Sequence, residues 1–175
     1  MSERLPFQVT SAAARYESLT SLPVSVVLDN LRSAYNVGSF FRTADAAGVS
    51  ALYLAGITAA PPHRGISKTA LGAEGRVRWE QRADVPSLFD DLRARGTEIA
   101  AIETSVHAVD LFDWKPRFPV CIVFGNELEG ICPEVSARCD IQIRIPMLGL
   151  KHSLNVATAG GVVIYELLRK YRELQ

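Results

Sequence analysis

The stretch Val120-Cys-Ile-Val-Phe-Gly-Asn-Glu-Leu-Glu-Gly130 indicates the fold class of this chain. Its opening residues are apolar and largely β-branched, which is typical of a strand buried on both faces of a sheet. Gly125 ends this strand, and Asn126 and Glu127 follow it directly. Because open α/β sheets bind ligands at the edge where their strands end, we expect these two polar residues at a ligand site. Gly125 and Gly130 would permit a sharp turn or a close backbone approach to a ligand; a solvated loop is the alternative.

Segments typical of strands and helices alternate along the rest of the chain. The sequence predicts strands at 24–28, 51–55, 76–80, 98–102, 120–124 and 141–145, and helices at 36–47, 86–95, 133–138 and 153–174. Residues 56–75 contain two adjacent prolines and four glycines, and there we predict a long loop with one helical turn. The alternation predicts an α/β fold with a mostly parallel sheet flanked by helices. Since we find no repeat or linker, we expect one domain over 1–175, with 1–22 as an N-terminal extension.

The composition indicates a globular protein and argues against several classes. Of 175 residues, 48% are hydrophobic and 22% charged, which is enough for a core. No apolar run is long enough to cross a membrane, and the N-terminus lacks the layout of a secretory signal. We therefore expect a cytoplasmic protein without a membrane partner. The three cysteines show no Cys-x-x-Cys spacing, so we predict free thiols and no metal site.

The net charge is zero, which argues neither for nor against nucleic acid as a partner. Residues 64–82 nevertheless hold five basic side chains against two glutamates, which is typical either of a phosphate-binding patch or of a solvated face. We name the loop 56–75 and this basic stretch as candidates for phosphate contacts, with Lys151 and His152 as further ones. Trp79 and Trp114 could stack on bases, but packing in the core or in an interface is the favoured interpretation.

Two more polar clusters accompany the predicted strands. Asn36-Val-Gly-Ser-Phe-Phe-Arg42 opens the first predicted helix, so Asn36 can cap the helix and Arg42 is expected on the same side. Ser153-Leu-Asn155, at the predicted start of the last helix, follows the strand end Ile143-Arg-Ile-Pro-Met147. Capping and ligand contact are compatible there, because a helix start offers free N–H groups. A simple cap and a surface arginine are the alternatives for these residues.

The usual signatures of dinucleotide-binding folds, P-loop proteins, serine hydrolases and zinc proteases are missing. The three clusters, in their order and spacing, instead resemble the motifs of the SpoU (TrmH-like) family of RNA methyltransferases in the SPOUT superfamily. The resemblance covers residues 24–168. It implies an α/β fold with a deep C-terminal trefoil knot, with 119–160 as the knotted cofactor-binding region, and a homodimer. The implied reaction is methyl transfer from S-adenosylmethionine to a ribose 2′-hydroxyl of RNA, which leaves S-adenosylhomocysteine.

The resemblance also assigns roles to residues of this chain. The family's catalytic and substrate-side residues correspond to Arg42, Asn36, Glu127, Ser153 and Asn155. Its cofactor-binding residues correspond to Glu103, Thr104, Gly125, Asn126, Gly130, Ile145, Met147, Ser153 and Leu154. The assignment at Glu103 rests on a position that varies within the family.

The family mechanism makes the residue at Arg42 the general base, which is chemically demanding. A guanidinium stays protonated at physiological pH and has no acceptor lone pair. Our hypothesis is that Arg42 orients the ribose or stabilises the developing alkoxide, with an RNA phosphate relaying the proton. We favour tRNA over rRNA as the substrate. The alternatives are a catalytically inactive RNA-binding relative and another α/β nucleotide-handling enzyme.

Two adjacent glycines, Gly160 and Gly161, lie inside the last predicted helix. Each costs about 1 kcal/mol relative to alanine, which would be compensated if a neighbouring element approached closely there. The family dimerises through this region, so we expect a homodimer; packing against the chain's own sheet is the alternative.

Overall fold

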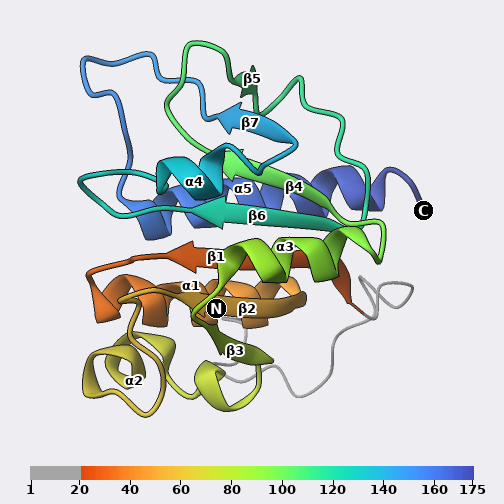
Figure 1. Cartoon of the computed structure of the whole chain (residues 1–175). Helices are drawn as coiled ribbons and strands as arrows, with labels where there is room; N and C mark the ends of the chain where they lie inside the picture. Colours follow the sequence, from red (N-terminus) through yellow and green to blue (C-terminus); the bar gives the residue numbers. More distant parts are fainter. Residues whose placement is uncertain (1–20) are drawn as a thin grey trace, which may run out of the picture.

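The sheet is parallel throughout the part of the chain that the computed structural model describes, residues 21–175. Its strands are β1 (Leu22–Asp29), β2 (Val49–Ala55), β3 (Trp79–Arg82), β4 (Glu98–Ile102), β5 (Val109–Asp110), β6 (Val120–Phe124) and β7 (Ile141–Arg144). They lie in the order β3-β2-β1-β6-β4-β7-β5, and neighbours pair in parallel (Figure 1). The predicted α/β class with a parallel sheet is confirmed. Apart from residues 21 and 22, the expected N-terminal extension lies outside the described residues.

Helices cover both faces of the sheet. They are α1 (Ala34–Ala47), α2 (Arg64–Ala70), α3 (Val85–Arg93), α4 (Pro133–Ser136) and α5 (Val156–Arg172), with a 3₁₀ turn, η1 (Ala73–Gly75). Val26 and Ile122 point into a core shared with α1, α2 and α5, whereas Val27 and Val123 point into a core shared with α3 and α4. Because successive side chains of a strand face opposite ways, β1 and β6 supply both cores at once. This explains why the sequence of β6 is continuously apolar and that of β1 nearly so.

Several predicted boundaries were wrong. Residues 56–75 hold α2 and η1 rather than one helical turn, because Ile66 and Ala70 are buried and the His63 side chain caps α2. The strand predicted at 76–80 begins at Trp79, and β5 was not predicted. The helix predicted to reach residue 138 ends at Ser136. The last helix begins at Val156 rather than at 153 and ends at Arg172.

The order of the strands selects one place along the sheet for a ligand. From β1 the chain crosses to β2 on one side, whereas β6 lies on the other side of β1. Where the connections from two neighbouring strands, here β1 and β6, run to opposite sides in this way, a crevice opens at the carboxyl ends of those strands. The loops that follow β1, β4, β6 and β7 all leave from this carboxyl edge, because parallel strands end on the same side.

Within residues 21–175, no helix combines the length and the apolar character that crossing a bilayer requires. In the same part of the chain, the His, Cys, Asp and Glu side chains nowhere form a group of three or more suited to holding a metal ion. Cys121, Cys132 and Cys139 are all unpaired thiols.

Candidate active site

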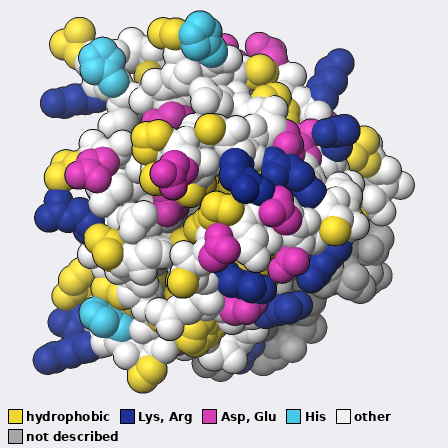
Figure 2. Space-filling view, in the orientation of Figure 1, with side chains coloured by type: hydrophobic (Ala, Val, Ile, Leu, Met, Phe, Trp, Pro, Cys, Tyr) yellow, Lys and Arg dark blue, Asp and Glu magenta, His cyan; other side chains and the backbone are white. Residues whose placement is uncertain are grey.

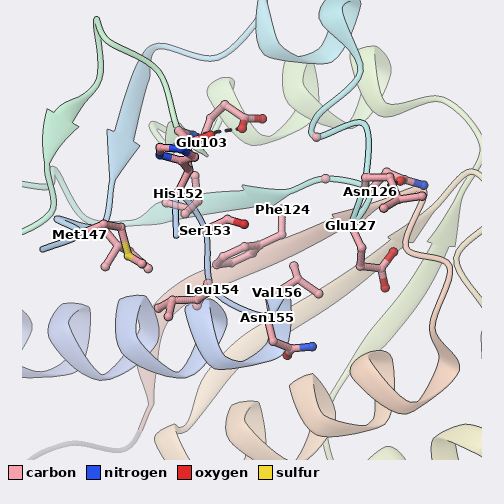
Figure 3. A pocket seen from close by; sticks show the side chains of 17 residues that line it. Glu103, Phe124, Asn126, Glu127, Met147, His152, Ser153, Leu154, Asn155 and Val156 are labelled. Carbon is pink, nitrogen blue, oxygen red and sulfur yellow. Dashed lines mark hydrogen bonds between the residues drawn. The ribbon is translucent and has the colours of Figure 1, made fainter. Parts of the chain in front are cut away.

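A cavity of about 280 Å³ lies at the carboxyl ends of β4 and β6, under the loop that joins β7 to α5 (Figure 3). Its wall contains all nine residues expected to bind a cofactor: Glu103, Thr104, Gly125, Asn126, Gly130, Ile145, Met147, Ser153 and Leu154. Glu127 and Asn155, expected on the substrate side, line it as well. The structure therefore brings together segments that are distant in sequence. Their individual roles stay predictions.

The turn after β6 forms the floor of the cavity and depends on its two glycines. Asn126 and Gly130 exchange backbone hydrogen bonds of 2.8 and 2.9 Å, which folds the chain back on itself. A Cβ atom on Gly125 would lie 2.2 Å from the backbone of Gly130 and Ile131, so a larger residue cannot be accommodated without moving the turn. Gly130 has a φ of +75°, a conformation that favours glycine. The sharp-turn interpretation of these glycines is confirmed.

Glu103 connects this turn to the end of β4. Its carboxylate accepts hydrogen bonds from the backbone N–H groups of Thr104 (3.0 Å) and Ile131 (3.1 Å). Asn126 connects the same turn to β1, because its side chain donates to the carbonyl of Asn30 (2.9 Å). Its Oδ1 atom accepts from the backbone of Leu128, 2.9 Å away, inside the turn. The floor of the cavity is thus fixed from two neighbouring strands.

Glu127 points from this turn toward the start of α1. Its carboxylate accepts from the backbone N–H groups of Arg32 (2.9 Å) and Ser33 (3.1 Å) and from the side-chain amide of Asn36 (2.9 Å). Partial burial acts to raise the pKa of Glu127, but these hydrogen bonds outweigh it and hold the pKa below its ordinary value. Glu127 is therefore an anion at neutral pH, bound to the N-terminal end of α1.

Asn36 and Asn155 continue this contact across the mouth of the cavity. Asn155 donates to Oδ1 of Asn36 (3.2 Å), and its own Oδ1 accepts from the backbone of Ala157 (3.0 Å) and Thr158 (3.3 Å) at the start of α5. Asn155 is thus the expected cap. Asn36, in contrast, does not cap α1. Ser33 caps this helix, which leaves the Asn36 side chain free to contact Glu127 and Asn155.

Two predicted placements need correction. Ser153 lies in the loop before α5, not in its first turn, although it still lines the cavity. Arg42 is exposed and does not line the cavity. In a regular helix, residues six apart differ by about 120° in direction and about 9 Å along the axis, so Arg42 and Asn36 do not share a side. The Arg42 side chain also has no hydrogen bond or ion pair to any other residue in the range 21–175.

Sequence reasoning did not name several residues of the cavity wall as ligand contacts: Ile102, Phe124, Leu128, Val156 and Ala159. Ile102 and Phe124 are the last residues of β4 and β6, and this position at a strand end is the sequence feature from which they could have been predicted. His152, predicted as a phosphate neighbour, also lines the cavity. Chemically, the cavity offers an apolar wall beside a polar mouth that carries an anion and two amides. It suits a small ligand with an aromatic part and polar ends.

The family model described as the SpoU rRNA Methylase family matches residues 23–165. The chain belongs to this family. Among its SpoU relatives, a Staphylococcus epidermidis protein named as a candidate TrmH family tRNA/rRNA methyltransferase is 33% identical over 162 residues. The match takes in 93% of this chain and 62% of that protein, so the chain spans about three fifths of the length of the curated relatives it matches.

Solved structures of SpoU proteins have the same fold. The TrmH/SpoU tRNA modifying enzyme of A. aeolicus superposes with a TM-score of 0.80 at 30% identity, covering 88% of this chain and 78% of that one. An AdoMet-bound rRNA methyltransferase from Sinorhizobium meliloti superposes with a TM-score of 0.78 at 31% identity, covering 83% and 56%. A protein described by its part in 2-OH methylation of C/U34 on tRNA gives a TM-score of 0.77 at 28% identity, covering 86% and 97%.

Proposed function

We propose that this SpoU protein is an RNA methyltransferase that uses S-adenosylmethionine to methylate a ribose 2′-hydroxyl. The observation that carries the proposal is the cavity at the carboxyl ends of β4 and β6, whose wall contains every residue expected to bind the cofactor. The AdoMet-bound SpoU structure supports the choice of cofactor. The relative concerned with 2-OH methylation of tRNA supports the ribose hydroxyl as the target.

The residues of the cavity fit an adenosine with a charged amino-acid arm. Phe124, Ile102 and Leu154 offer apolar surface for a purine ring, and the polar groups of Glu103 and Asn126 lie beside them. The volume of about 280 Å³ is close to the lower limit of typical small-molecule pockets, about 300 Å³. When bound, S-adenosylmethionine would supply a methyl group made electrophilic by its sulfonium.

The chain's own residues would then position the ribose. Glu127, Asn36 and Asn155 form one connected polar group at the mouth of the cavity, and Ser153 adds a hydroxyl beside it. Because Glu127 is already bound to three N–H groups, its main effect would be to hold α1 and the β6 turn in a fixed relation. Fixed geometry alone can lower a barrier by several kcal/mol when the reacting atoms are held in line.

Arg42 would act from outside the cavity. With no partner among the described residues, its guanidinium is available to an RNA ribose or phosphate. A guanidinium donates five N–H groups and accepts none, so we assign it to orienting the ribose and stabilising the developing alkoxide. The hydroxyl proton would pass to an RNA phosphate or to solvent.

The assembly and the substrate belong to the same proposal. We propose a homodimer formed through α5, where Val162 and Tyr165 are 37% and 50% exposed one turn apart and Gly161 faces open space. Gly160, in contrast, is packed against the ring of Phe40, the close approach expected of this glycine pair.

A single domain, the trefoil knot over 119–160 and a cytoplasmic location stay predictions. The relative concerned with tRNA, almost all of which the chain covers, favours tRNA over rRNA.

A methyl-transfer assay tests the proposal. Purified protein is incubated with tritiated S-adenosylmethionine and either total tRNA or rRNA from cells that lack the gene. We expect label in tRNA, and mass spectrometry should find it on a ribose. Binding of S-adenosylmethionine without any transfer would instead support the inactive RNA-binding relative. Absence of cofactor binding in calorimetry would support another nucleotide-handling enzyme.

A further inference from the structure

The cations of the described chain divide into a paired and an unpaired set. Arginines and lysines of the later half mostly form ion pairs, as in Arg93–Asp140 and Arg144–Asp110. Between residues 32 and 78, in contrast, no cation forms an ion pair to a residue in the range 21–175; these are Arg32, Arg42, Arg64, Lys68, Arg76 and Arg78. The same segment contains two carboxylates, Asp45 and Glu74. The part of the molecule built from α1, α2 and η1 is therefore rich in uncompensated positive charge.

Part of this charge lies on the cavity's side of the sheet, because Arg32 precedes α1 and Arg64 begins α2 next to Ala34, whereas Arg76 and Arg78 precede β3 at the opposite edge. Lys and Arg side chains project from the left edge of the molecule in Figure 2, which is the edge at which β1 and β6 end in Figure 1. Helix α2 packs on α1 where Gly38 allows it, since a Cβ there would lie 2.4 Å from the carbonyl oxygen of Ile66. Thr69 of α2 donates to the carbonyl of Tyr35 (2.9 Å), which fixes the two helices near the start of α1.

An exposed aromatic ring lies in this charged region. Tyr35 is 52% exposed and directly precedes Asn36, whose side chain belongs to the polar mouth of the cavity. The Nζ atom of Lys68 lies over the Tyr35 ring, 6.0 Å from its centroid. Tyr35 also precedes Arg42 by seven residues, nearly two helical turns, so both side chains lie on the same outward stripe of α1.

The tryptophans do not offer such a surface. Trp114 is 3% exposed and donates to Glu98, and Trp79 packs edge-on against Phe41 at 6.4 Å. The expectation that both tryptophans serve packing is confirmed. Tyr35 is thus the aromatic side chain that joins exposure, neighbouring cations and closeness to the cavity mouth.

We propose that Tyr35 and Lys68 form a platform for an unpaired nucleotide of the RNA, with the base stacked on the Tyr35 ring and an adjoining phosphate on Lys68. This inference rests on the proposed function and specifies its substrate as RNA with an unstacked, single-stranded nucleotide at the target. A base inside a duplex has both faces covered by its neighbours, whereas a loop base presents a free face to an aromatic ring. Arg32 and Arg64, which are unpaired and lie near the start of α1, would bind the flanking phosphates.

The test measures the affinity of the full chain for a labelled, mixed-sequence RNA 12-mer and for the duplex of the same sequence. Tyr35→Ala should weaken binding of the single strand about tenfold, within the range for loss of one stacked base. Tyr35→Phe keeps the ring and should stay within about twofold of the wild type, and duplex binding should not respond to either change. Lys68→Met should reduce the slope of log Kd against log salt by about 0.7, the value for one phosphate contact on a single strand.

Matched controls separate this platform from general effects. Phe112→Ala removes another aromatic ring, 63% exposed, and Lys115→Met removes another exposed lysine that forms no ion pair with residues 21–175; both variants should bind the 12-mer as the wild type does. The platform is ruled out if Tyr35→Ala binds the single strand normally, or if Tyr35→Phe loses as much affinity as Tyr35→Ala. Failure of the proposed function has a different signature. The wild type would then transfer no methyl group to any RNA, whatever the Tyr35 variants bind.

Discussion

Glu127 contacts residues 94 and 95 positions earlier in the chain, and no local sequence pattern contains this information. Serine and asparagine are about equally good N-caps, so the sequence around Ser33 and Asn36 cannot decide which of them caps α1. The choice depends on Glu127, which engages the Asn36 amide from the β6 turn. Residues at strand ends, such as Asn126, could be predicted, because the end of a parallel strand determines their position.

Replacing Glu127 by glutamine should destabilise the fold in a pH-dependent way. The pKa of Glu127 is lower in the folded protein than its ordinary value of 4.5, so the ionised carboxylate favours folding. This stabilisation is present above pH 4.5 and is lost as the pH falls below it. We expect Glu127→Gln to lower the free energy of unfolding by about 1 kcal/mol at pH 7, and the difference from wild type to shrink toward pH 4.

Urea denaturation followed by circular dichroism, between pH 7 and pH 4, measures this difference. Glu129→Gln is the matched control, because the Glu129 side chain accepts no hydrogen bond from residues 21–175. A difference between the wild type and Glu127→Gln that stays constant over this pH range would contradict the prediction.

Arg42→Ala should remove most methyl transfer while leaving cofactor affinity near the wild-type value. The reason is positional, since Arg42 lies outside the cavity wall and would meet the RNA rather than the cofactor. We expect a loss of at least a hundredfold in the single-turnover rate constant for methyl transfer, the scale of a removed charge-stabilising donor. Single-turnover assays and calorimetry measure the two quantities. Arg95→Ala, at another exposed arginine, should change neither. Normal turnover by Arg42→Ala would exclude the assigned role.

At the scale of elements, the hydrophobic periodicity of the sequence predicted the strands and helices that pack in the cores of the sheet. It did not predict an element whose stability depends on contact between two helices. The buried strands β1 and β6 were found because their sequences are almost entirely apolar and rich in β-branched residues. Helix α2 was missed, because a seven-residue helix is too short to be stable alone and depends on its contact with α1. Strand β5 has two residues, too few to show any alternation.

The contact of α1 with α2 provides a stability prediction. Gly38→Ala would place a Cβ 2.1 Å from the Thr69 hydroxyl and 2.4 Å from the carbonyl oxygen of Ile66, so the helices must separate. We expect a loss of about 1–3 kcal/mol in unfolding free energy, measured in urea. Gly75→Ala is the control, since a Cβ there meets nothing within 4 Å. Equal unfolding free energies for Gly38→Ala and Gly75→Ala would show that α2 can move away from α1 without loss of stability, which would contradict the prediction.

At the scale of the whole molecule, one face of α5 contacts the sheet and the other leaves Val162 and Tyr165 exposed. Light scattering should give a mass of about twice the 19.1 kDa of one chain at micromolar concentration. Glutamate at both positions should shift this mass to that of the monomer, because a buried, unpaired charge is costly. The Ile57→Glu variant, at a 68% exposed position elsewhere, should remain dimeric. A wild-type mass of one chain would refute the dimer.

The hydrogen bond between Asn36 and Asn155 spans 119 residues and has a consequence for synthesis. A ribosome synthesises Asn36 at the start of α1 first and adds Asn155 only 119 residues later. Until that segment has left the exit tunnel, the nascent chain has no closed mouth to its cavity. The protein therefore acquires its site only after Asn155 has emerged, and a chain stalled before that point would expose the unpaired cations of α1 and α2 without the closed site that they accompany.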